Sequence, residues 1–477
     1  MENFPSWLTK QMIKGVRKFN LDAYLLALEG WRRGLTLTWY YDMPKEAALE
    51  LVGFNPIAKS FSLASREKKH FFYRSRGDMV SNQAVKVAGD KQLTKQFLNE
   101  RNILTPQGRG FSREHSLEDI LEYIKGLEFP IVIKPSLGSL GNGVFTNIYT
   151  YEEAKRAVDT IRNELDYEDI LVEEHIEGKE YRVYKVGEEV VACTLKKKPH
   201  IIGNGIDSIQ TLIEEKNRYR KENPHLSQKL IKIDDNLISF LKKKSQSLDT
   251  VLKDGEFCLL GEVANTSVGG ESHNLTQSAV PHEIKKVVSV LSRKFPEMPH
   301  GGIDLILRDN KPYIIEMNST ASYAQHIFPY QGEPINVCAK IIDFYFPESI
   351  ESNINERAYF NYKKIREILK DRLVDRVEIT SLRNNNELSV KRYIVKGKVQ
   401  GVGYREWARR HASKFRINGY VKNLKNGSVV IIAWSNNEGN FKTFEEGLWE
   451  GPKRSKVSQV NELTWDKQLN IGFEIKK

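Results

Sequence analysis

The sequence lacks the features of membrane-spanning, disulfide-rich and zinc-binding proteins. No stretch approaches the run of about eighteen apolar residues that a helix needs to cross a bilayer. The three cysteines, Cys193, Cys258 and Cys338, lie far apart without metal-type spacing, which is typical of buried thiols in a reducing compartment. Basic residues interrupt the short apolar runs near the N-terminus, so no signal peptide is expected. We therefore expect a soluble, cytoplasmic protein with no membrane partner.

The chain also lacks a concentrated basic region, although its net charge is +11. Nucleic-acid binding proteins cluster Lys and Arg to neutralise phosphates. Here the longest basic runs are Lys196–Lys198 and Lys242–Lys244, acidic residues lie among the others, and no zinc-finger or RNP motif is present. We do not expect nucleic acid as a partner, because a solvated surface or anionic small substrates explain the charge more simply.

The length of 477 residues predicts about three domains. Residues 1–88 alternate helical patterns with short strands such as Leu35–Tyr41, which indicates a small α/β lead-in domain. Residues 89–346 carry repeated strand–turn–strand patterns and form the large central unit. Residues 347–388, with charged helix-forming stretches and the turn-rich Arg383–Asn386, are predicted to be a linker. Residues 389–477 form a last domain, so the fold class is a multidomain mixture of α/β and α+β.

A glycine-rich hairpin in the central unit is a candidate phosphate-binding loop. The apolar strand Ile131–Lys134 ends on a lysine and is followed by Gly138, Gly141 and Gly143. Glycine permits positive φ and close backbone approach, so successive N–H groups can surround an anion. Another strand follows the loop and Gly-Lys-Ser/Thr is absent, so the pattern is a flap and not a Walker loop. Considered alone, an ordinary turn remains the alternative.

Acidic residues follow a second apolar strand, Ile170–Glu174. Glu173, Glu174 and, after a turn, Glu180 offer acceptors for an adenine amino group and for ribose hydroxyls. A solvated strand end is the simpler interpretation of this segment in isolation.

A third segment, His300–Asn318, reads as a β-hairpin that turns at Asp309-Asn310. Pairing across this turn sets Asp304 nearly opposite Glu316, and alternation places Asn318 on the same face as Glu316. Opposed carboxylates repel unless a cation lies between them. Their hard oxygen ligands suit Mg²⁺ that bridges nucleotide phosphates.

The order of these segments resembles the ATP-grasp superfamily, and more narrowly the ligase domains of cyanophycin synthetase and of the bifunctional glutathione synthetases. Those domains open with an Asp-Lys-x-x-Thr-Lys helix, which Asp90–Lys95 matches. The resemblance implies ATP with Mg²⁺, or Mn²⁺ as an alternative metal. It also implies a set of roles: phosphate contacts from Lys91 and Lys134, adenine contacts from Glu173 and Ile176, a ribose contact from Glu180, and metal ligands Asp304, Glu316 and Asn318.

Two further stretches are similar to the parts of those ligases near the acyl phosphate and the acceptor, namely His200–Gly205 and Asn265–Gly270. The cyanophycin-type pattern has an arginine four residues before the asparagine, whereas this chain has Gly261, followed by Glu262. An acidic group there favours a cationic amine if it faces the pocket, and is a plain surface residue if it does not. The amine therefore stays open.

The last domain carries a loop, Val399–Tyr404, between a strand and a helix. Backbone amides at the helix start attract an anion, and Arg405 adds a bidentate donor for phosphate oxygens. The segment resembles acylphosphatase over nearly its whole length, including Gly419–Leu424 and Gly451-Pro452. The resemblance implies a ferredoxin-like sandwich in which Arg405 binds the acyl phosphate and Asn423 orients the hydrolytic water. A domain kept for docking alone is the alternative.

Together these patterns predict an ADP-forming ligase that joins a small-molecule carboxylate, such as an amino acid or peptide, to an amine through an acyl phosphate. The fused domain is expected to hydrolyse acyl phosphates. Two other functions stay open: an ATP-binding regulator or scaffold, and a ligase that adds amino acids to a protein terminus. The sequence leaves the oligomeric state open, with a homodimer as one option.

Overall fold

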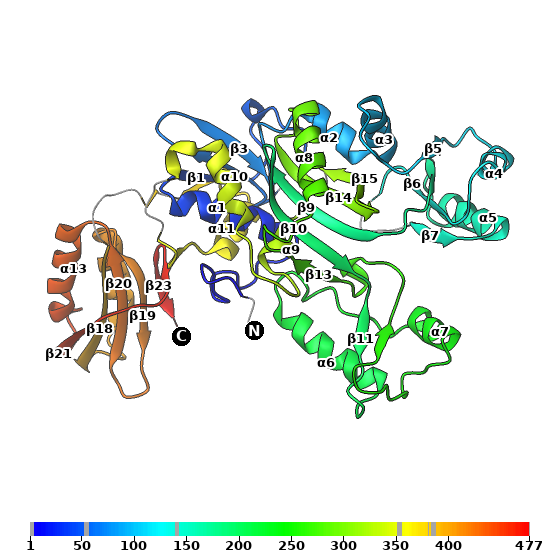
Figure 1. Cartoon of the computed structure of the whole chain (residues 1–477). Coiled ribbons are helices and arrows are strands. Elements are labelled where there is room, and N and C mark those ends of the chain that lie inside the picture. Colours follow the sequence, from blue (N-terminus) through cyan, green and yellow to red (C-terminus); the bar gives the residue numbers. More distant parts are fainter. Residues whose placement is uncertain are drawn as a thin grey trace.

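The computed structural model describes residues 4–51, 57–138, 143–350, 355–379, 381–382 and 388–476. Figure 1 shows an N-terminal unit in the middle, two sheet-containing lobes on one side of it, and a separate C-terminal domain on the other. Within the described ranges, no helix combines the length and the apolar character that crossing a membrane requires.

The N-terminal unit is a five-stranded sheet in the order β17-β1-β2-β3-β4, packed against the buried helix α1 (Phe19–Arg32). Aromatic side chains dominate its core, with Trp31, Trp39 and Phe61 fully buried. The remaining elements are β1 (Thr36–Tyr40), η1 (Lys45–Ala47), β2 (Ser60–Ala64), β3 (Lys69–Tyr73), β4 (Arg76–Gly77), α10 (Val337–Tyr345), η4 (Pro347–Ser349), β16 (Ala358–Tyr359), α11 (Tyr362–Lys370) and β17 (Arg376–Ile379).

The stretch that was predicted to be a linker contributes to this unit. β17 pairs antiparallel with β1, from Leu37 opposite Ile379 to Tyr40 opposite Arg376. The charged helix α11 buries one apolar stripe against the same core, made of Tyr362, Ile365 and Leu369. Residues 358–379 are therefore packed structure and not a tether; the turn-rich residues 383–386 lie outside the described part of the chain.

The first lobe of the central unit is the four-stranded sheet β5-β8-β6-β7, with helices α4 and α5 over one face. The predicted strands at residues 131–134 and 170–174 are confirmed. The elements are β5 (Gly108–Phe111), α4 (Leu117–Ile124), β6 (Ile131–Pro135), β7 (Phe145–Ile148), α5 (Tyr151–Asp159), the π-helical turn η2 (Thr160–Glu164) and β8 (Ile170–Glu174).

The second lobe is the five-stranded sheet β13-β10-β9-β14-β15, backed by α2, α3 and α8. The predicted hairpin is confirmed, because Asp309 and Asn310 both adopt positive φ, at 48° and 60°, as a two-residue hairpin turn requires. The elements are α2 (Asn82–Gly89), α3 (Lys91–Glu100), β9 (Lys179–Val186), β10 (Glu189–Lys197), β13 (Glu271–Asn274), α8 (His282–Lys294), β14 (His300–Arg308), β15 (Lys311–Asn318) and α9 (Ala324–Ile327).

A smaller subdomain with its own apolar core is inserted between β10 and β13. It contains β11 (His200–Ile202), α6 (Ile209–Glu222), α7 (Asp235–Lys243), β12 (Phe257–Leu259) and the 3₁₀ turn η3 (Thr266–Val268).

The C-terminal domain has the sheet order β21-β18-β20-β19-β23. Its first six elements run β18-α12-β19-β20-α13-β21, and the first, second, third and fourth of these strands lie in the order 4-1-3-2, which confirms the ferredoxin-like sandwich. The elements are β18 (Ser389–Lys398), α12 (Tyr404–Lys414), β19 (Asn418–Asn423), β20 (Val429–Ser435), α13 (Glu438–Glu450), β21 (Lys456–Leu463), β22 (Leu469–Asn470) and β23 (Phe473–Lys476).

Candidate functional site

A buried carboxylate in the first lobe is clamped by two lysines. Glu173, at the end of β8, contacts Lys134 of β6 at 2.5 Å and Lys95 of α3 at 2.7 Å. Burial opposes ionisation of Glu173, but the two ammonium groups outweigh it and hold the pKa of Glu173 below its usual range. The side chain of Glu173, which was predicted to serve the adenine edge, is thus occupied in holding Lys134 and Lys95 in position.

Lys91 connects the two lobes. Its Nζ donates to the carbonyl of Gly138 at 3.0 Å, at the start of the glycine-rich loop. Burial lowers the pKa of Lys91, and both Glu316 and Lys134 are close enough to act on it. The first residue of α3 therefore brings the loop of one sheet next to the acidic hairpin of the other.

The glycine-rich loop is described on both sides of its tip. Gly138 and Gly143 both adopt positive φ, at 150° and 70°, which side chains with a Cβ rarely take. Gly141 lies outside the described residues. The strand–loop–strand arrangement of β6 and β7 is the one predicted for a flap.

The acidic hairpin brings together the residues that were predicted to lie nearly opposite each other. Asp304 pairs with Glu316 after a register shift between Asp304 and Leu305, and Gly302 pairs with Asn318. Met317 is buried in the core, so its neighbours Glu316 and Asn318 lie on the opposite face of β15. The Asn318 amide lies 3.5 Å from the Asp304 carboxylate. The three oxygen-bearing side chains therefore share one face of the hairpin.

Two cations that sequence reasoning missed also lie at Asp304. Arg182 of β9 forms an ion pair with one carboxylate oxygen, and Lys196 of β10 contacts the other at 2.7 Å. Burial opposes the ionisation of Asp304, but these two groups outweigh it and lower the pKa of the carboxyl. The alternation of β9 and β10 was the available signal, because it places both residues on the same face as Asp304.

This donor set fits a hard divalent cation. Two carboxylates and an amide provide oxygen ligands of the kind that Mg²⁺ and Mn²⁺ accept. No group of three His, Cys, Asp or Glu side chains suited to a metal occurs in the described ranges. A metal here would therefore take its remaining ligands from phosphate oxygens or water.

The two other residues predicted to contact the nucleotide are Ile176 and Glu180. Ile176 is buried just beyond β8, with 4 % of its surface exposed. Glu180 is half-buried in β9, opposite Ile306 of β14. Ile176 lies in the connection from β8 of the first lobe to β9 of the second, and Glu180 lies near the start of β9. Both residues are therefore close to the boundary between the two lobes.

A buried arginine holds the loop Asn265–Gly270 by hydrogen bonds to its backbone carbonyls. Arg220 of α6 donates to the carbonyls of Thr266, Gly269 and Gly270 at 2.8, 3.2 and 3.1 Å. Next to the loop, burial opposes the ionisation of Glu271, but His273 and Lys216 outweigh it and lower its pKa to about 2. Three hydrogen bonds from Arg220 thus hold the backbone of this loop, and paired charges lie next to it at Glu271.

Glu262 forms an ion pair near the protein surface. Its carboxylate pairs with Lys198 at 2.6 Å, and both side chains are more than two-fifths exposed. This exposed pair favours the surface alternative for Glu262, and the amine stays open.

A second candidate site lies in the C-terminal domain, at the start of α12. Gly401 and Gly403 adopt positive φ, at 73° and 79°, with open space where a Cβ would lie. Gln400 donates to the carbonyls of Leu424 and Ser428 at 2.8 Å, which fixes the loop against the end of β19. The backbone amides of the loop are thus presented at a helix N-terminus, as anion binding requires.

The two predicted side chains of this site come from the elements next to the loop, α12 and β19. Arg405 is half-buried in the first turn of α12. Asn423 ends β19, and its Oδ1 atom is buried without a hydrogen-bond partner among the described residues. A buried carbonyl oxygen of this kind is costly unless a ligand or a water satisfies it.

Two family matches cover the parts of the chain that carry these candidate sites. The RimK-like ATP-grasp domain family matches residues 88–200, and the acylphosphatase family matches residues 391–475. The chain joins an ATP-grasp domain to an acylphosphatase domain. The predicted resemblances to these two families are thereby confirmed.

Similar individual proteins share parts of the chain. The cyanophycin synthetase of Geminocystis herdmanii is 32 % identical over 57 % of this chain and 32 % of its own length. The glutathione biosynthesis bifunctional protein GshAB of Clostridium perfringens is 31 % identical over 72 % of this chain and 44 % of its own. The solved acylphosphatase of Coxiella burnetii is 34 % identical over 19 % of this chain and 93 % of its own, with a TM-score of 0.18. The chain thus spans less than half the length of either curated relative.

Proposed function

We propose that the protein is an ATP- and Mg²⁺-dependent ligase that forms an amide bond between a carboxylate and an amine, with an attached acylphosphatase. The observation that carries this proposal is the meeting of two sheets at Lys91. Lys91 contacts Gly138 of the flap and lies close to both Lys134 and Glu316. One compact region therefore offers cations for phosphate oxygens and oxygen ligands for a metal.

In the first step, an oxygen of the substrate carboxylate attacks the γ-phosphorus of ATP, and the bond to the β,γ-bridging oxygen breaks, giving an acyl phosphate and ADP. Lys134 and Lys91 offset the charge on the phosphate oxygens, and Glu173 holds Lys134 in place. Bound by Asp304, Glu316 and Asn318, Mg²⁺ would neutralise further phosphate charge.

In the second step, the amine nitrogen attacks the acyl carbon, the bond from that carbon to the phosphate oxygen breaks, and phosphate leaves. The amine gives up one proton, which passes to phosphate or water. The acyl phosphate is unstable in water, so the site must exclude solvent while the amine binds. We assign to the loop that Arg220 holds by three carbonyl contacts the role of a wall on the acceptor side.

In the C-terminal domain, we assign acyl phosphate binding to Arg405 and to the amides of the loop ending at Gly403. The unpartnered Oδ1 atom of Asn423 accepts from a water, which attacks phosphorus in line. The phosphorus–acyl oxygen bond breaks, and the products are a carboxylate and phosphate with release of a proton.

A screen of acid and amine pairs tests the ligase. Full-length protein with ATP and Mg²⁺ should release ADP together with an amide detected by mass spectrometry. Glu316→Ala should lower the rate by about 100-fold or more, because the paired metal ligand is lost. Glu262→Ala is the matched control, since Glu262 is an exposed partner of Lys198, and should keep the full rate. Full activity in Glu316→Ala contradicts the metal assignment.

Benzoyl phosphate hydrolysis tests the smaller domain separately. We expect the wild type to hydrolyse it and Arg405→Ala to lose about 100-fold or more of this activity, because the bidentate phosphate donor is gone. Ligation by Arg405→Ala should be unaffected. A wild-type protein that does not hydrolyse benzoyl phosphate would favour a docking role for the domain.

A further inference from the structure

The C-terminal domain carries almost all of the net positive charge of the chain. Residues 389–477 contain 18 Lys and Arg residues and 8 Asp and Glu residues, so they contribute +10 of the net charge of +11. The placement of these charges matters, because exposed charges more than about 10 Å apart are largely screened from one another at about 0.1 M salt. The basic runs of the sequence are short, so only the fold shows whether the charge is concentrated.

The fold concentrates eight of these cations around the candidate anion loop Val399–Tyr404. They belong to three segments, residues 396–405, 422–428 and 451–458, and these segments contain no Asp or Glu. The segments are the end of β18 with the loop, the end of β19 with its turn, and the connection from α13 into β21. All of the cations except Arg405 are exposed, and the eight are Lys396, Lys398, Arg405, Lys422, Lys425, Lys453, Arg454 and Lys456.

Direct contacts hold the three segments together. Gln400 of the loop donates to the carbonyls of Leu424 and Ser428, both in the turn after β19, at 2.8 Å. A Cβ on Gly451 would meet the ring of Tyr404, the first residue of α12, so the connection into β21 packs against the start of that helix. The exposed lysines and arginines therefore lie around one loop.

Two of these lysines oppose each other directly. Lys398 pairs with Lys456 across β18 and β21. Like charges in this position destabilise a strand pair, and a bound anion would remove that cost. In the described part of this domain, the carboxylates that form ion pairs contact Lys391 and Arg409 instead. The lysine pair is therefore available to a negatively charged ligand.

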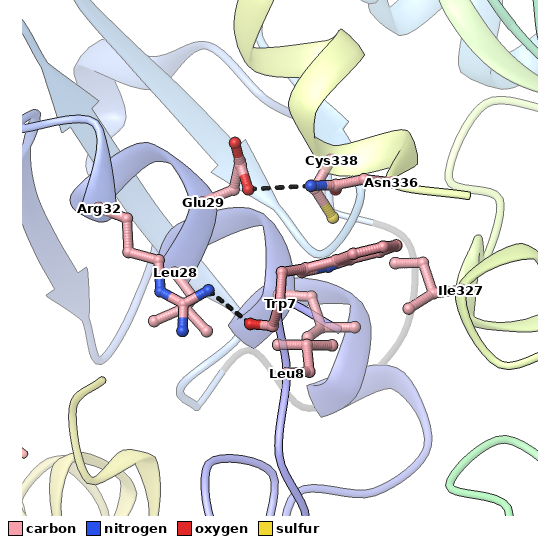
Figure 2. A pocket seen from close by; sticks show the side chains of 9 residues that line it. Trp7, Leu8, Leu28, Glu29, Arg32, Ile327, Asn336 and Cys338 are labelled. Atoms are coloured by element: carbon pink, nitrogen blue, oxygen red, sulfur yellow. Dashed lines mark hydrogen bonds between the residues drawn. The ribbon is translucent and has the colours of Figure 1, made fainter. Parts of the chain in front are cut away.

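The domain is docked to the rest of the chain through a different region. β22 pairs in parallel with β16 of the N-terminal unit. Arg32 holds β16 from the other side, because it donates to the carbonyls of Ala358 and, as Figure 2 shows, of Trp7, both at 2.9 Å. The cavity in that view holds about 10 Å³, room for about one water molecule, so this region is packed and is not a ligand site.

The length of β19 separates the docked region from the anion loop. Asn470 of β22 donates to the carbonyl of Gly419, near the start of β19, at 3.3 Å. Asn423 ends the same strand four residues later, which corresponds to about 13 Å. Docking therefore leaves the loop and its exposed cations accessible to a substrate larger than phosphate.

We propose that the C-terminal domain selects acyl phosphates whose acyl group carries further carboxylates, and that Lys398 and Lys456, with Lys453 and Arg454, bind these carboxylates. This inference rests on the proposed acylphosphatase activity and names the substrate class of that site. The anion loop and Arg405 bind the phosphate, while the surrounding cations attract the additional charge of the acyl group. Because these cations are exposed, the selection is sensitive to salt.

A matched pair of substrates tests the selection. Benzoyl phosphate and 4-carboxybenzoyl phosphate share one ring and differ by a single carboxylate. Their hydrolysis by the full chain is compared at about 0.01 M salt and at about 1 M salt, where the Debye length falls from about 30 Å to about 3 Å. The proteins are the wild type, Lys398→Gln/Lys456→Gln, and Lys414→Gln/Lys442→Gln. The last is a control with the same change of charge at exposed positions outside the three segments.

We expect kcat/KM at low salt to be about 10-fold higher for 4-carboxybenzoyl phosphate, through a lower KM, and this ratio to approach 1 at high salt. Lys398→Gln/Lys456→Gln should lose most of the preference, whereas Lys414→Gln/Lys442→Gln should keep it. Equal kcat/KM for the two substrates, or a full preference in Lys398→Gln/Lys456→Gln, overturns the assignment. Equal values together with inhibition by a single-stranded DNA oligonucleotide would assign the cations to nucleic acid instead.

Binding of phosphonates separates this inference from the acylphosphatase proposal. Hydrolysis of neither substrate would overturn the proposed activity. Calorimetry with benzoylphosphonate and 4-carboxybenzoylphosphonate, in which a carbon–phosphorus bond replaces the ester link, then decides whether the binding site exists. Binding of the carboxylated compound about 10-fold more tightly leaves the present inference standing, and equal binding of the two compounds overturns it as well.

Discussion

Asp22 is a fully buried carboxylate of helix α1, and the free-energy cost of keeping it ionised can be tested without a ligand. Burial raises the pKa of Asp22 from 3.8 to about 6, against the opposing effect of Arg74 and Lys229, the charged groups that face it. The shift corresponds to about 3 kcal/mol at about 1.4 kcal/mol per unit. Since Asn cannot ionise and keeps an acceptor for Ser322, Asp22→Asn should remove this cost.

The direction of the pKa shift of Asp22 determines how the stability of the fold depends on pH. Because the pKa of Asp22 is higher in the folded state, the folded protein binds the proton more tightly. The stability that this proton contributes is fully present below about pH 4 and is lost as the pH rises through about 6. Asp22→Asn should therefore match the wild type near pH 4 and exceed it at pH 7.

Thermal unfolding between pH 4.5 and 7.5 measures this difference, with Glu29→Gln as the control. A gain of about 3 kcal/mol should raise the Tm of Asp22→Asn by about 5 °C at pH 7, and by little at pH 4.5. Glu29→Gln should be destabilised throughout, because Arg33 loses its buried partner. A variant Asp22→Asn that is less stable than the wild type at pH 7 would refute the reasoning, since it would show that the charge stabilises the fold.

Two further predictions concern the ATP-grasp and acylphosphatase sites. Glu173→Gln leaves the buried Lys95 and Lys134 without a counter-charge. We therefore expect denaturant unfolding to show a free energy of unfolding lower by about 3 kcal/mol, together with weaker binding of an ATP analogue. Unchanged stability of this variant contradicts the prediction. Asn423→Ala should lower kcat for benzoyl phosphate by about 100-fold and leave KM near the wild-type value, because Asn423 orients water while Arg405 binds the phosphate; a raised KM with full kcat would show that Asn423 binds substrate instead.

The acidic hairpin was predictable because its information is local. The Asp309-Asn310 turn fixes the register as far as Leu305 opposite Ile314, and a register shift between Asp304 and Leu305 then places Asp304 opposite Glu316 instead of Ile315. The ferredoxin-like sandwich of the C-terminal domain was implied by the resemblance to acylphosphatase, and the observed strand order agrees with it.

The partners of these residues were harder to predict from the sequence, because contacts between distant segments determine them. Arg182 and Lys196 reach Asp304 from strands more than a hundred residues earlier in the chain. The contribution of β17 to the first sheet also joins distant segments, although the spacing of Tyr362, Ile365 and Leu369 does indicate an amphipathic helix in the supposed linker.

The sequence gives only a weak signal that Asp22 is buried. It stands within the apolar run Leu21–Leu28, where a charged residue is unusual. Nothing local distinguishes it from Glu29, which shares that helix and its burial. Only the structure reveals their different partners: Asp22 has the Ser322 hydroxyl at 2.8 Å and the Arg74 guanidinium at 3.7 Å, whereas both oxygens of Glu29 accept hydrogen bonds.

The attachment of the acylphosphatase domain bears on how the two activities cooperate. β22 of this domain pairs in parallel with β16, and Arg357 donates to the Lys467 carbonyl at 3.1 Å and to the Trp465 carbonyl at 2.5 Å. The domain is thus docked beside the N-terminal unit, whereas Figure 1 shows the flap strands β6 and β7 at the far end of the molecule. Under the proposed function, an acyl phosphate formed in the ATP-grasp domain would have to leave it before hydrolysis. The arrangement therefore predicts a fused domain that acts on acyl phosphate released into solution.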